Sequence, residues 1–415
     1  MDTYERLAAR TVIAGIRGHV ASPEELALVR RGIGGVILFS RNVRDPQQVA
    51  ELSRQLKAAA PGPLMISIDQ EGGRVQRLRP PHWTQLPTMR RIGELDGRTD
   101  HHDVHRASPQ FHQPQAELQP PRPQAPAPRH ALDGGQIAAE LGKLMARELS
   151  ACGIDQDFAP VVDVDTNPNN PVIGDRAFGS DERQVARLGM ALASALEKHG
   201  VAACAKHFPG HGDTSQDSHR DLPRLAHDLG RLWEVELVPF MAAARAGISS
   251  IMTAHVVFEG FDSLPATLSP RLLHLLRKEI GFGGCIVSDD LEMAAIAQQY
   301  GVLDGAALAV AAGCDAVLVC HSLQLQHEVI DAIASAARSG PLARGRLQQA
   351  AEHVALLQRF ARSASSIDPS QAAAACGTAE ARAFVESLGV STPPLPAAAA
   401  VAAQAIALDP TERRA

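Results

Sequence analysis

Eight short apolar runs, each rich in β-branched residues and followed by a helical pattern, constrain the fold of this chain most strongly. The runs occupy residues 11–16, 35–39, 64–68, 157–162, 201–205, 249–254, 285–288 and 315–320. Runs of this kind between helices are typical of buried parallel strands in repeated βα units, and eight such units close a barrel. We therefore predict an α/β fold with a single (β/α)8 barrel of the TIM type.

Independent start signals mark the helices between these runs. Ser22-Pro23-x-Glu25 combines an N-cap, a proline at the first helical position and a capping-box glutamate, and Asp45-Pro46 and Ser269-Pro270 repeat the cap and the proline. An open doubly wound sheet is the alternative arrangement, but no GxGxxG motif follows the first run to support a dinucleotide site. The closed barrel is the favoured architecture.

Two segments depart from the βα pattern and set the predicted domain boundaries. Residues 96–134 hold seven prolines between Pro109 and Pro128 and little apolar content, which predicts a disordered insertion. Their five histidines lack a fixed backbone, so a solvated loop is favoured over a metal site. Residues 366–415 are Ala- and Pro-rich and predict a loosely attached C-terminal tail. The catalytic domain is thus predicted to span residues 1–365.

Composition limits the kinds of partner that the protein can bind and indicates its cellular compartment. The chain has 40 Lys and Arg against 46 Asp and Glu, a net charge of -6, which offers no basic field for nucleic acid or an acidic membrane. Its six cysteines lack paired CxxC spacing, so neither a disulfide framework nor a zinc knuckle is indicated. Charged residues interrupt the N-terminal segment where a signal peptide needs an apolar core, and no later run reaches membrane-spanning length. We expect a cytoplasmic monomer without membrane insertion.

Ionisable residues directly follow five of the eight runs. These residues are Asp69, Asp163, Lys206, His255 and Asp289. In a barrel the ends of the strands meet at the C-terminal rim, where catalytic groups project. Charged residues of ordinary solvated loops would not fall regularly at the ends of the strands. An active site is therefore predicted at this rim.

The segment KHFPGHGDTSQDSH (206–219) predicts a mobile loop over the barrel mouth, because its glycines and proline preclude a helix. Asp217 and His219 can share a hydrogen bond in which the carboxylate orients the imidazole and stabilises its protonated form, giving a general acid. A structural contact that closes the loop is equally compatible with this spacing. A divalent metal bound by the histidines and aspartates of the loop is less favoured, since a Gly-Pro loop does not pre-organise ligands.

The seventh run ends in two adjacent carboxylates, Asp289 and Asp290. Neighbouring strand residues point to opposite faces, so one of the two is expected to face the rim as a nucleophile. Capping of the helix that follows is the alternative role for Asp290.

Four motifs resemble the β-N-acetylglucosaminidases of glycoside hydrolase family 3. They are IDQEGGRVQRL (68–78), GDRAFG (174–179), KHFPGHGDTSQDSH (206–219) and SDDLEM (288–293). The resemblance covers most of residues 10–360. It implies a retaining β-N-acetylhexosaminidase that removes terminal non-reducing β-linked N-acetylglucosamine from peptidoglycan fragments (muropeptides) during cell-wall recycling. No metal and no organic cofactor is implied.

The resemblance also implies roles for single residues. Asp289 is the implied nucleophile, and His219 is the implied acid/base with Asp217 as its partner. The implied substrate-binding residues are Asp69, Arg77, Arg176, Lys206 and His207. Three other functions keep these residues: a β-N-acetylglucosaminide phosphorylase with the same site, a metal-dependent hydrolase, and a sugar-binding protein that has lost catalysis.

Overall fold

The eight apolar runs form a closed ring of parallel strands in the computed structural model, which describes residues 1–97, 132–216, 221–340 and 342–390. The strands of the ring are β1 (Val12–Gly15), β2 (Gly35–Leu38), β3 (Met65–Ile68), β6 (Gln156–Asp157), β7 (Ala202–Phe208), β9 (Ser250–Thr253), β11 (Cys285–Asp290) and β12 (Ala316–Val319). Each pairs in parallel with its two neighbours, and β1 closes the ring by pairing with both β2 and β12. The predicted (β/α)8 barrel is therefore confirmed.

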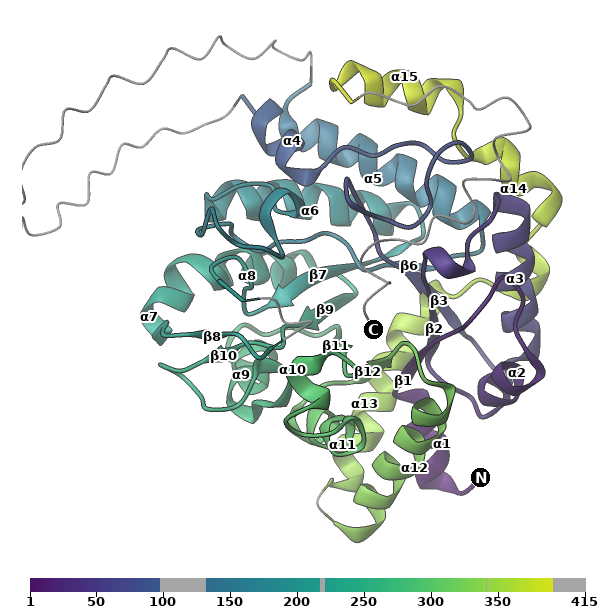
Figure 1. Ribbon diagram of the computed structural model, residues 1–415, viewed down its shortest axis with the longest axis vertical. Helices are drawn as coiled ribbons and strands as arrows, with labels where there is room; N and C mark the ends of the chain where they lie inside the picture. Colours follow the sequence, from purple (N-terminus) through teal and green to yellow (C-terminus); the bar gives the residue numbers. More distant parts are fainter. Residues whose placement is uncertain (98–131, 217–220, 341, 391–415) are drawn as a thin grey trace, which may run out of the picture.

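Helices surround this ring, as Figure 1 shows. The longer ones are α1 (Thr3–Arg10), α2 (Pro23–Arg30), α3 (Pro46–Ala59), α5 (Gly134–Ala151), α6 (Glu182–Lys198), α8 (Leu237–Ala246), α11 (Val302–Ala312), α12 (Leu323–Ser339) and α13 (Arg344–Leu357). The predicted N-caps are present. Ser22 and Glu25 form the reciprocal capping box of α2, and Asp45 and Ser269 accept hydrogen bonds from the first turns of α3 and of α9 (Pro270–His274).

The apolar core is divided into two clusters, one inside the barrel and one between the barrel and the helices. Ile13, Ile37, Phe158, Met252 and Val287 are almost fully buried within one cluster, to which different strands of the ring contribute. Alternate residues of the same strands, such as Val36 and Ile66, belong to the larger cluster with the helices. The period-2 alternation of strands thus produces a filled barrel with a helix-covered outside.

Strand β7 is longer than its apolar run predicts. Lys206 and His207 lie within it, because the main chain continues to pair with Val161 on one side and, through Phe208, with β9 on the other. We expected both residues on the loop, and the structure places them on the barrel wall. Their side chains are consequently fixed by the strand and not carried by a moving segment.

Short strands extend the loops at the C-terminal rim. β4 (Gln70–Gly72) and β5 (Val75–Gln76) form an antiparallel hairpin directly after β3, and β8 (Arg224–Leu225) pairs in parallel with β10 (Val257–Phe258). These pairings hold the connections after β3, β7 and β9 close to the ends of the barrel strands. In the described residues, these connections at the rim are therefore structured.

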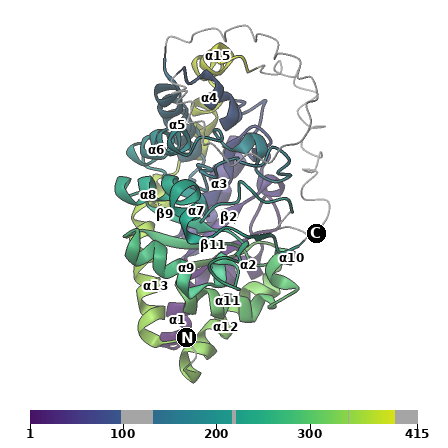
Figure 2. The same cartoon turned by 90° about the vertical axis from the view of Figure 1, so that its left-hand side faces the viewer.

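The segment after residue 365 packs on the barrel as far as residue 390. Its helices α14 (Pro369–Ala375) and α15 (Ala379–Ser387) lie beside α3, α5 and α4 (Met89–Leu95), and Figure 1 and Figure 2 place α15 next to α4. Val385 and Leu388 are fully buried. This packing differs from the loose attachment that we expected, because Ala372, Val385 and Leu388 supply apolar contacts that an Ala-rich composition conceals. Residues 391–415 lie outside the described residues.

The C-terminal helices also contact the loop that follows β5. Glu148 of α5 accepts hydrogen bonds from the Thr84 hydroxyl (2.6 Å) and from the main-chain N–H of Gly377 (2.8 Å). Arg382 of α15 donates to the carbonyl oxygen of Pro81 at 2.7 Å. The end of the described chain is thereby joined to a loop of the rim.

Most of the predicted insertion, residues 98–131, lies outside the described residues. Both of its flanks are structured. The Asp96 carboxylate is buried and pairs with Arg187 of α6, and Asp133 caps the N-terminus of α5. In the described part of the chain, no helix is both long and apolar enough to cross a bilayer.

Candidate active site

The five predicted substrate-binding residues lie in one continuous chain of charged and polar groups at the C-terminal rim. Lys206 of β7 donates to Asp69 at 2.8 Å, and Arg77 pairs with the other oxygen of Asp69 at 3.4 Å. On the other side, Arg176 lies 3.5 Å from Nε2 of His207. Strand ends and loops far apart in the sequence thus converge on one site, as the registration of the runs predicts.

Glu71 joins the two halves of this chain. One of its oxygens accepts from Lys206 at 2.7 Å, and its carboxylate binds both Nε and Nη2 of Arg176 at 2.8 Å. Burial alone would raise the pKa of Glu71, but Arg176 and Lys206 lower that pKa well below its usual value. Glu71 therefore stays ionised, and its charge holds both cations in position.

The same pairing keeps Lys206 charged. Its side chain is 3% exposed, and burial would lower the pKa of the ammonium, but Asp69 and Glu71 raise it above the usual lysine range. The ammonium directs two of its three N–H groups to carboxylates, so its orientation is fixed. A fixed cation of this kind suits a role in holding substrate hydroxyls.

Asp163 anchors the far end of the chain and holds the start of the loop after β7. Its Oδ2 lies 2.7 Å from Nδ1 of His207, and its Oδ1 accepts from the main-chain N–H groups of His207 and His211. The carboxylate thus fixes the plane of the His207 ring and directs Nε2 of this ring toward Arg176. Glu71 and Asp163 are site residues that our sequence analysis left without a role. Their signal was present, because Glu71 lies in the quoted IDQEGGR motif and Asp163 directly follows a strand.

A local irregularity presents the predicted nucleophile, Asp289. Between Val287 and Asp290 the pairing of β11 with β12 shifts by one residue, so β11 contains an extra residue at this point. The alternation of strand faces does not apply across such a bulge, and Asp289 and Asp290 are both half-buried. Oδ1 of Asp289 accepts from the main-chain N–H of Asp290 at 2.8 Å. Asp290 does not cap the next helix, α10 (Ala294–Ala297), since its carboxylate pairs with His321 at 3.3 Å.

The loop after β7 is fastened to the connection that follows β6. The side-chain amide of Asn170 donates to the carbonyl oxygens of His211 (2.8 Å) and Gly212 (3.0 Å). Gly212 also passes so close to that connection that a Cβ atom would lie 1.9 Å from the Val164 carbonyl oxygen. A glycine is therefore required here for the close approach of two main chains.

The predicted acid/base pair, Asp217 and His219, lies outside the described residues. The described loop histidines and aspartate on which a metal site would depend have separate partners. His207 contacts Asp163, His211 contacts Thr214 at 2.7 Å, and Asp213 contacts His227 at 2.9 Å. Over the described ranges, no group of three or more such side chains is placed to hold a metal ion.

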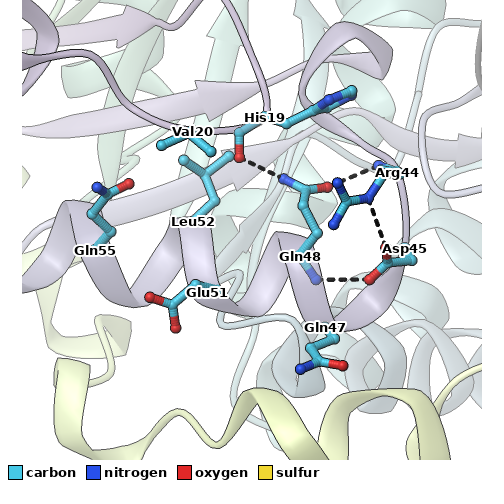
Figure 3. Close-up of a pocket in the computed structure, with 9 residues that line it drawn as sticks. All are labelled: His19, Val20, Arg44, Asp45, Gln47, Gln48, Glu51, Leu52 and Gln55. Carbon is cyan, nitrogen blue, oxygen red and sulfur yellow. Dashed lines mark hydrogen bonds and ion pairs between the residues drawn. The ribbon is translucent and has the colours of Figure 1, made fainter.

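A separate cavity of about 420 Å³ lies beside α3, as Figure 3 shows. It is lined by His19, Val20, Arg44, Asp45, Gln47, Gln48, Glu51, Leu52 and Gln55. Its central amide, Gln48, is hydrogen-bonded within the wall, to the carbonyl oxygen of His19 and to the main-chain N–H of Arg44, both at 2.8 Å. None of its lining residues belongs to the charged chain, so we do not place the chemistry there.

Asp157, at the end of β6, is a buried carboxyl beneath the site. Its Oδ1 accepts from the Gln70 N–H at 2.9 Å, and its Oδ2 is buried without a hydrogen-bond partner in the described chain. Burial, with added repulsion from Asp69 and Glu71, raises the pKa of Asp157 to about 8 despite the attraction of Lys206. The carboxyl is thus protonated at neutral pH in the folded protein.

We expect the Asp157→Asn variant to lose part of the pH dependence of stability. In the unfolded chain Asp157 ionises near pH 4, whereas the folded protein keeps the proton until about pH 8. The stabilisation from this group is complete below pH 4 and decreases by up to ~1.4 kcal/mol per pH unit until the folded pKa is reached. Denaturant unfolding of both proteins between pH 5 and 8 measures the difference. Parallel stability curves would show that Asp157 is ionised throughout.

The family of the chain follows from comparison with known proteins. Residues 11–357 match the model described as the Glycosyl hydrolase family 3 N terminal domain. The chain belongs to glycoside hydrolase family 3. The resemblance inferred from the four motifs is therefore confirmed.

Named family 3 relatives match most of the chain. A β-hexosaminidase of Thiobacillus denitrificans is 40% identical over 299 residues, which are 72% of this chain and 74% of the relative. A β-hexosaminidase of Nitrosomonas eutropha is 37% identical over 343 residues, covering 81% and 89% of the two chains.

Solved structures show the same similarity. A family 3 β-N-acetylglucosaminidase from a Paenibacillus species shares 35% identity at a TM-score of 0.79, over 94% of this chain and 68% of that one. NagZ from Neisseria gonorrhoeae shares 34% identity at a TM-score of 0.72, over 92% of this chain and 98% of NagZ.

Proposed function

We propose that this family 3 chain is a retaining exo-β-N-acetylglucosaminidase that acts on muropeptides in the cytoplasm, as a monomer, during cell-wall recycling. The observation that carries this proposal is the partly buried chain of charges from Arg77 to Asp163, at the rim that also bears Asp289. The names of the relatives support the sugar: several are β-hexosaminidases, and NagZ of Neisseria gonorrhoeae has a solved complex with N-trifluoroacetyl-D-glucosamine.

The charges from Arg77 to Asp163 balance one another, which suits a neutral sugar. Three cations, Arg77, Arg176 and Lys206, alternate with three carboxylates, Asp69, Glu71 and Asp163. Because these six charges cancel, this part of the site has no excess charge with which to attract an ionic group, and it offers fixed donors and acceptors instead. Sugar hydroxyls and an N-acetyl amide are groups that donate and accept at once, so they match such a lining.

Two displacements account for the proposed reaction. The Asp289 carboxylate attacks the anomeric carbon while the protonated imidazole of His219 gives its proton to the departing glycosidic oxygen. Neutral His219 then removes a proton from a water molecule, whose oxygen attacks the same carbon and releases Asp289. Asp217 orients the imidazole. Two inversions at one carbon retain the β-configuration.

Assays on defined substrates test this proposal. The purified protein should hydrolyse aryl β-N-acetylglucosaminides and muropeptides with terminal N-acetylglucosamine, and it should leave the matching β-glucosides nearly unreacted. NMR of the first product should show the β-anomer of N-acetylglucosamine, in buffer with or without inorganic phosphate. A first-formed α-anomer would contradict retention, and N-acetylglucosamine 1-phosphate formed in phosphate buffer would identify a phosphorylase. Loss of activity on chelation would identify a metal-dependent hydrolase.

A further inference from the structure

His255 is a fully buried histidine that lies two residues after the end of β9 and has no role in the reaction described above. Both of its ring nitrogens are engaged. Nδ1 lies 2.8 Å from the hydroxyl oxygen of Thr267, and Nε2 lies 2.9 Å from the main-chain carbonyl oxygen of Asp290. The Nε2 contact places His255 against the residue that directly follows the predicted nucleophile, Asp289.

The acceptor on Asp290 fixes the direction of these hydrogen bonds. A carbonyl oxygen only accepts, so Nε2 of His255 must carry the hydrogen and donate it. In the neutral ring Nδ1 is an acceptor that faces the Thr267 hydroxyl at 2.8 Å, and this hydroxyl also lies 2.8 Å from the Thr253 hydroxyl and 3.1 Å from the Ala254 carbonyl oxygen. Burial lowers the pKa of His255 against the attraction of Asp289 and Asp290, which favours the neutral ring. The Asp290 carbonyl oxygen thus sets the tautomer of His255, and the Thr267 hydroxyl faces the unprotonated Nδ1.

Asp290 links His255 to the nucleophile through two of its main-chain hydrogen bonds. Its carbonyl oxygen accepts from His255 at 2.9 Å and from the Met293 N–H at 3.1 Å, and its own N–H donates to Oδ1 of Asp289 at 2.8 Å. Both groups lie at the bulge of β11, where the regular pairing with β12 is interrupted after Val287. A bulge leaves the main chain less constrained by the ladder of the sheet, so bonds from outside the strand determine where its side chains point.

We propose that His255 is a positioning residue for the nucleophilic step: its Nε2–H···O bond to Asp290 fixes the β11 bulge in the form that directs Asp289 to the anomeric carbon. This inference rests on the proposed function, because it takes Asp289 as the nucleophile. His255 does not touch the substrate in this arrangement. Its effect is therefore expected on the rate of glycosyl-enzyme formation and not on binding of the sugar.

A pair of His255 variants tests the role of the Nε2 donor. His255→Phe keeps a planar ring but removes both nitrogens, whereas His255→Gln places an amide N–H within reach of the Asp290 carbonyl. We expect the phenylalanine variant to form glycosyl-enzyme with a fluorinated N-acetylglucosaminide about 10²-fold more slowly, since a displacement of about 1 Å costs that much. The glutamine variant should recover at least about tenfold of this loss. The inhibition constant of N-acetylglucosamine should change less than about threefold in both.

The outcomes separate this inference from the proposed function. Mass spectrometry of the labelled wild-type protein first establishes whether Asp289 carries the sugar, and a label elsewhere would overturn the proposed nucleophile. If Asp289 is labelled but His255→Phe reacts at the wild-type rate, the positioning role is overturned while the nucleophile stands. Equal losses in rate and in N-acetylglucosamine binding would also overturn it, because they would show a general distortion of the site.

A second variant keeps the test decisive if His255→Phe does not fold. Thr267→Val removes the hydroxyl that faces Nδ1 and leaves His255 in place. The ring then loses its second hydrogen-bond partner and is held less firmly, so labelling should slow by about tenfold, with N-acetylglucosamine binding unchanged. Labelling of Thr267→Val at the wild-type rate would contradict the proposed chain of hydrogen bonds.

Discussion

Asp289→Ala is expected to reduce turnover of every glycoside by at least about 10⁴-fold, because the covalent step has no alternative nucleophile of comparable reactivity. The variant should fold, since Asp289 is half-buried at the rim and does not belong to the apolar core. Steady-state kinetics on an aryl N-acetylglucosaminide, with circular dichroism as the control for folding, measure this effect.

The fluorinated substrate analogue makes the assignment specific to one residue. In the wild-type protein its label is expected on Asp289 and not on Asp290, whose carboxylate is engaged by His321. A label on Asp290 would transfer the nucleophilic role to that residue. Retention of more than about one hundredth of the activity in Asp289→Ala would exclude a covalent route through Asp289.

His219→Ala is expected to lower kcat/KM most for substrates whose leaving groups need protonation. Substrates with sugar leaving groups should lose about 10²–10⁴-fold in kcat/KM, while activated aryl glycosides, which depart without a proton, should lose far less. With the activated substrates, hydrolysis of the glycosyl-enzyme becomes the slow step, because no base activates the water. Rapid-quench mass spectrometry should then show the accumulated intermediate, and azide should restore turnover as an anionic nucleophile.

The partner residue provides a matched comparison for this prediction. Asp217→Ala should show the same pattern with smaller losses, because the imidazole remains but loses its orientation and part of its basicity. If His219→Ala slows activated and unactivated substrates equally and no intermediate accumulates, His219 only shapes the site. The acid/base role would then belong to another residue.

The sequence predicted the barrel because its signal is local and repeated. Each apolar run reports a strand through β-branched residues within a few positions, and capped helices such as Ser22-Pro23 confirm the intervals between them. The prediction ended β7 too early, at residue 205, because Lys206 and His207 look like loop residues in sequence. They belong to the strand because each finds a buried partner, Glu71 or Asp163, from another loop.

The sequence predicted which residues lie together in the candidate site, but it did not predict the contacts that join them. The motifs name Asp69, Arg77, Arg176, Lys206 and His207, and the structure brings all five together. The linking role of Glu71, the extra residue in β11 and the buried chain behind His255 depend on contacts between distant segments, which no local pattern reports. The roles of Asp289, Asp217 and His219, the sugar-binding roles of the five motif residues, and the division of the chain at residue 365 stay predictions.

Because Gly377 contacts the loop after β5, residues outside the barrel help to hold the proposed sugar site in place. A Cβ atom at Gly377 would lie 2.6 Å from the carbonyl oxygen of His82, so no larger residue fits there without moving the loop. That loop follows Arg77, which pairs with Asp69. A side chain added at Gly377 would consequently displace the wall of the sugar site from behind. Searches for altered substrate affinity in this enzyme should therefore include the C-terminal helices, even though they contain none of the predicted site residues.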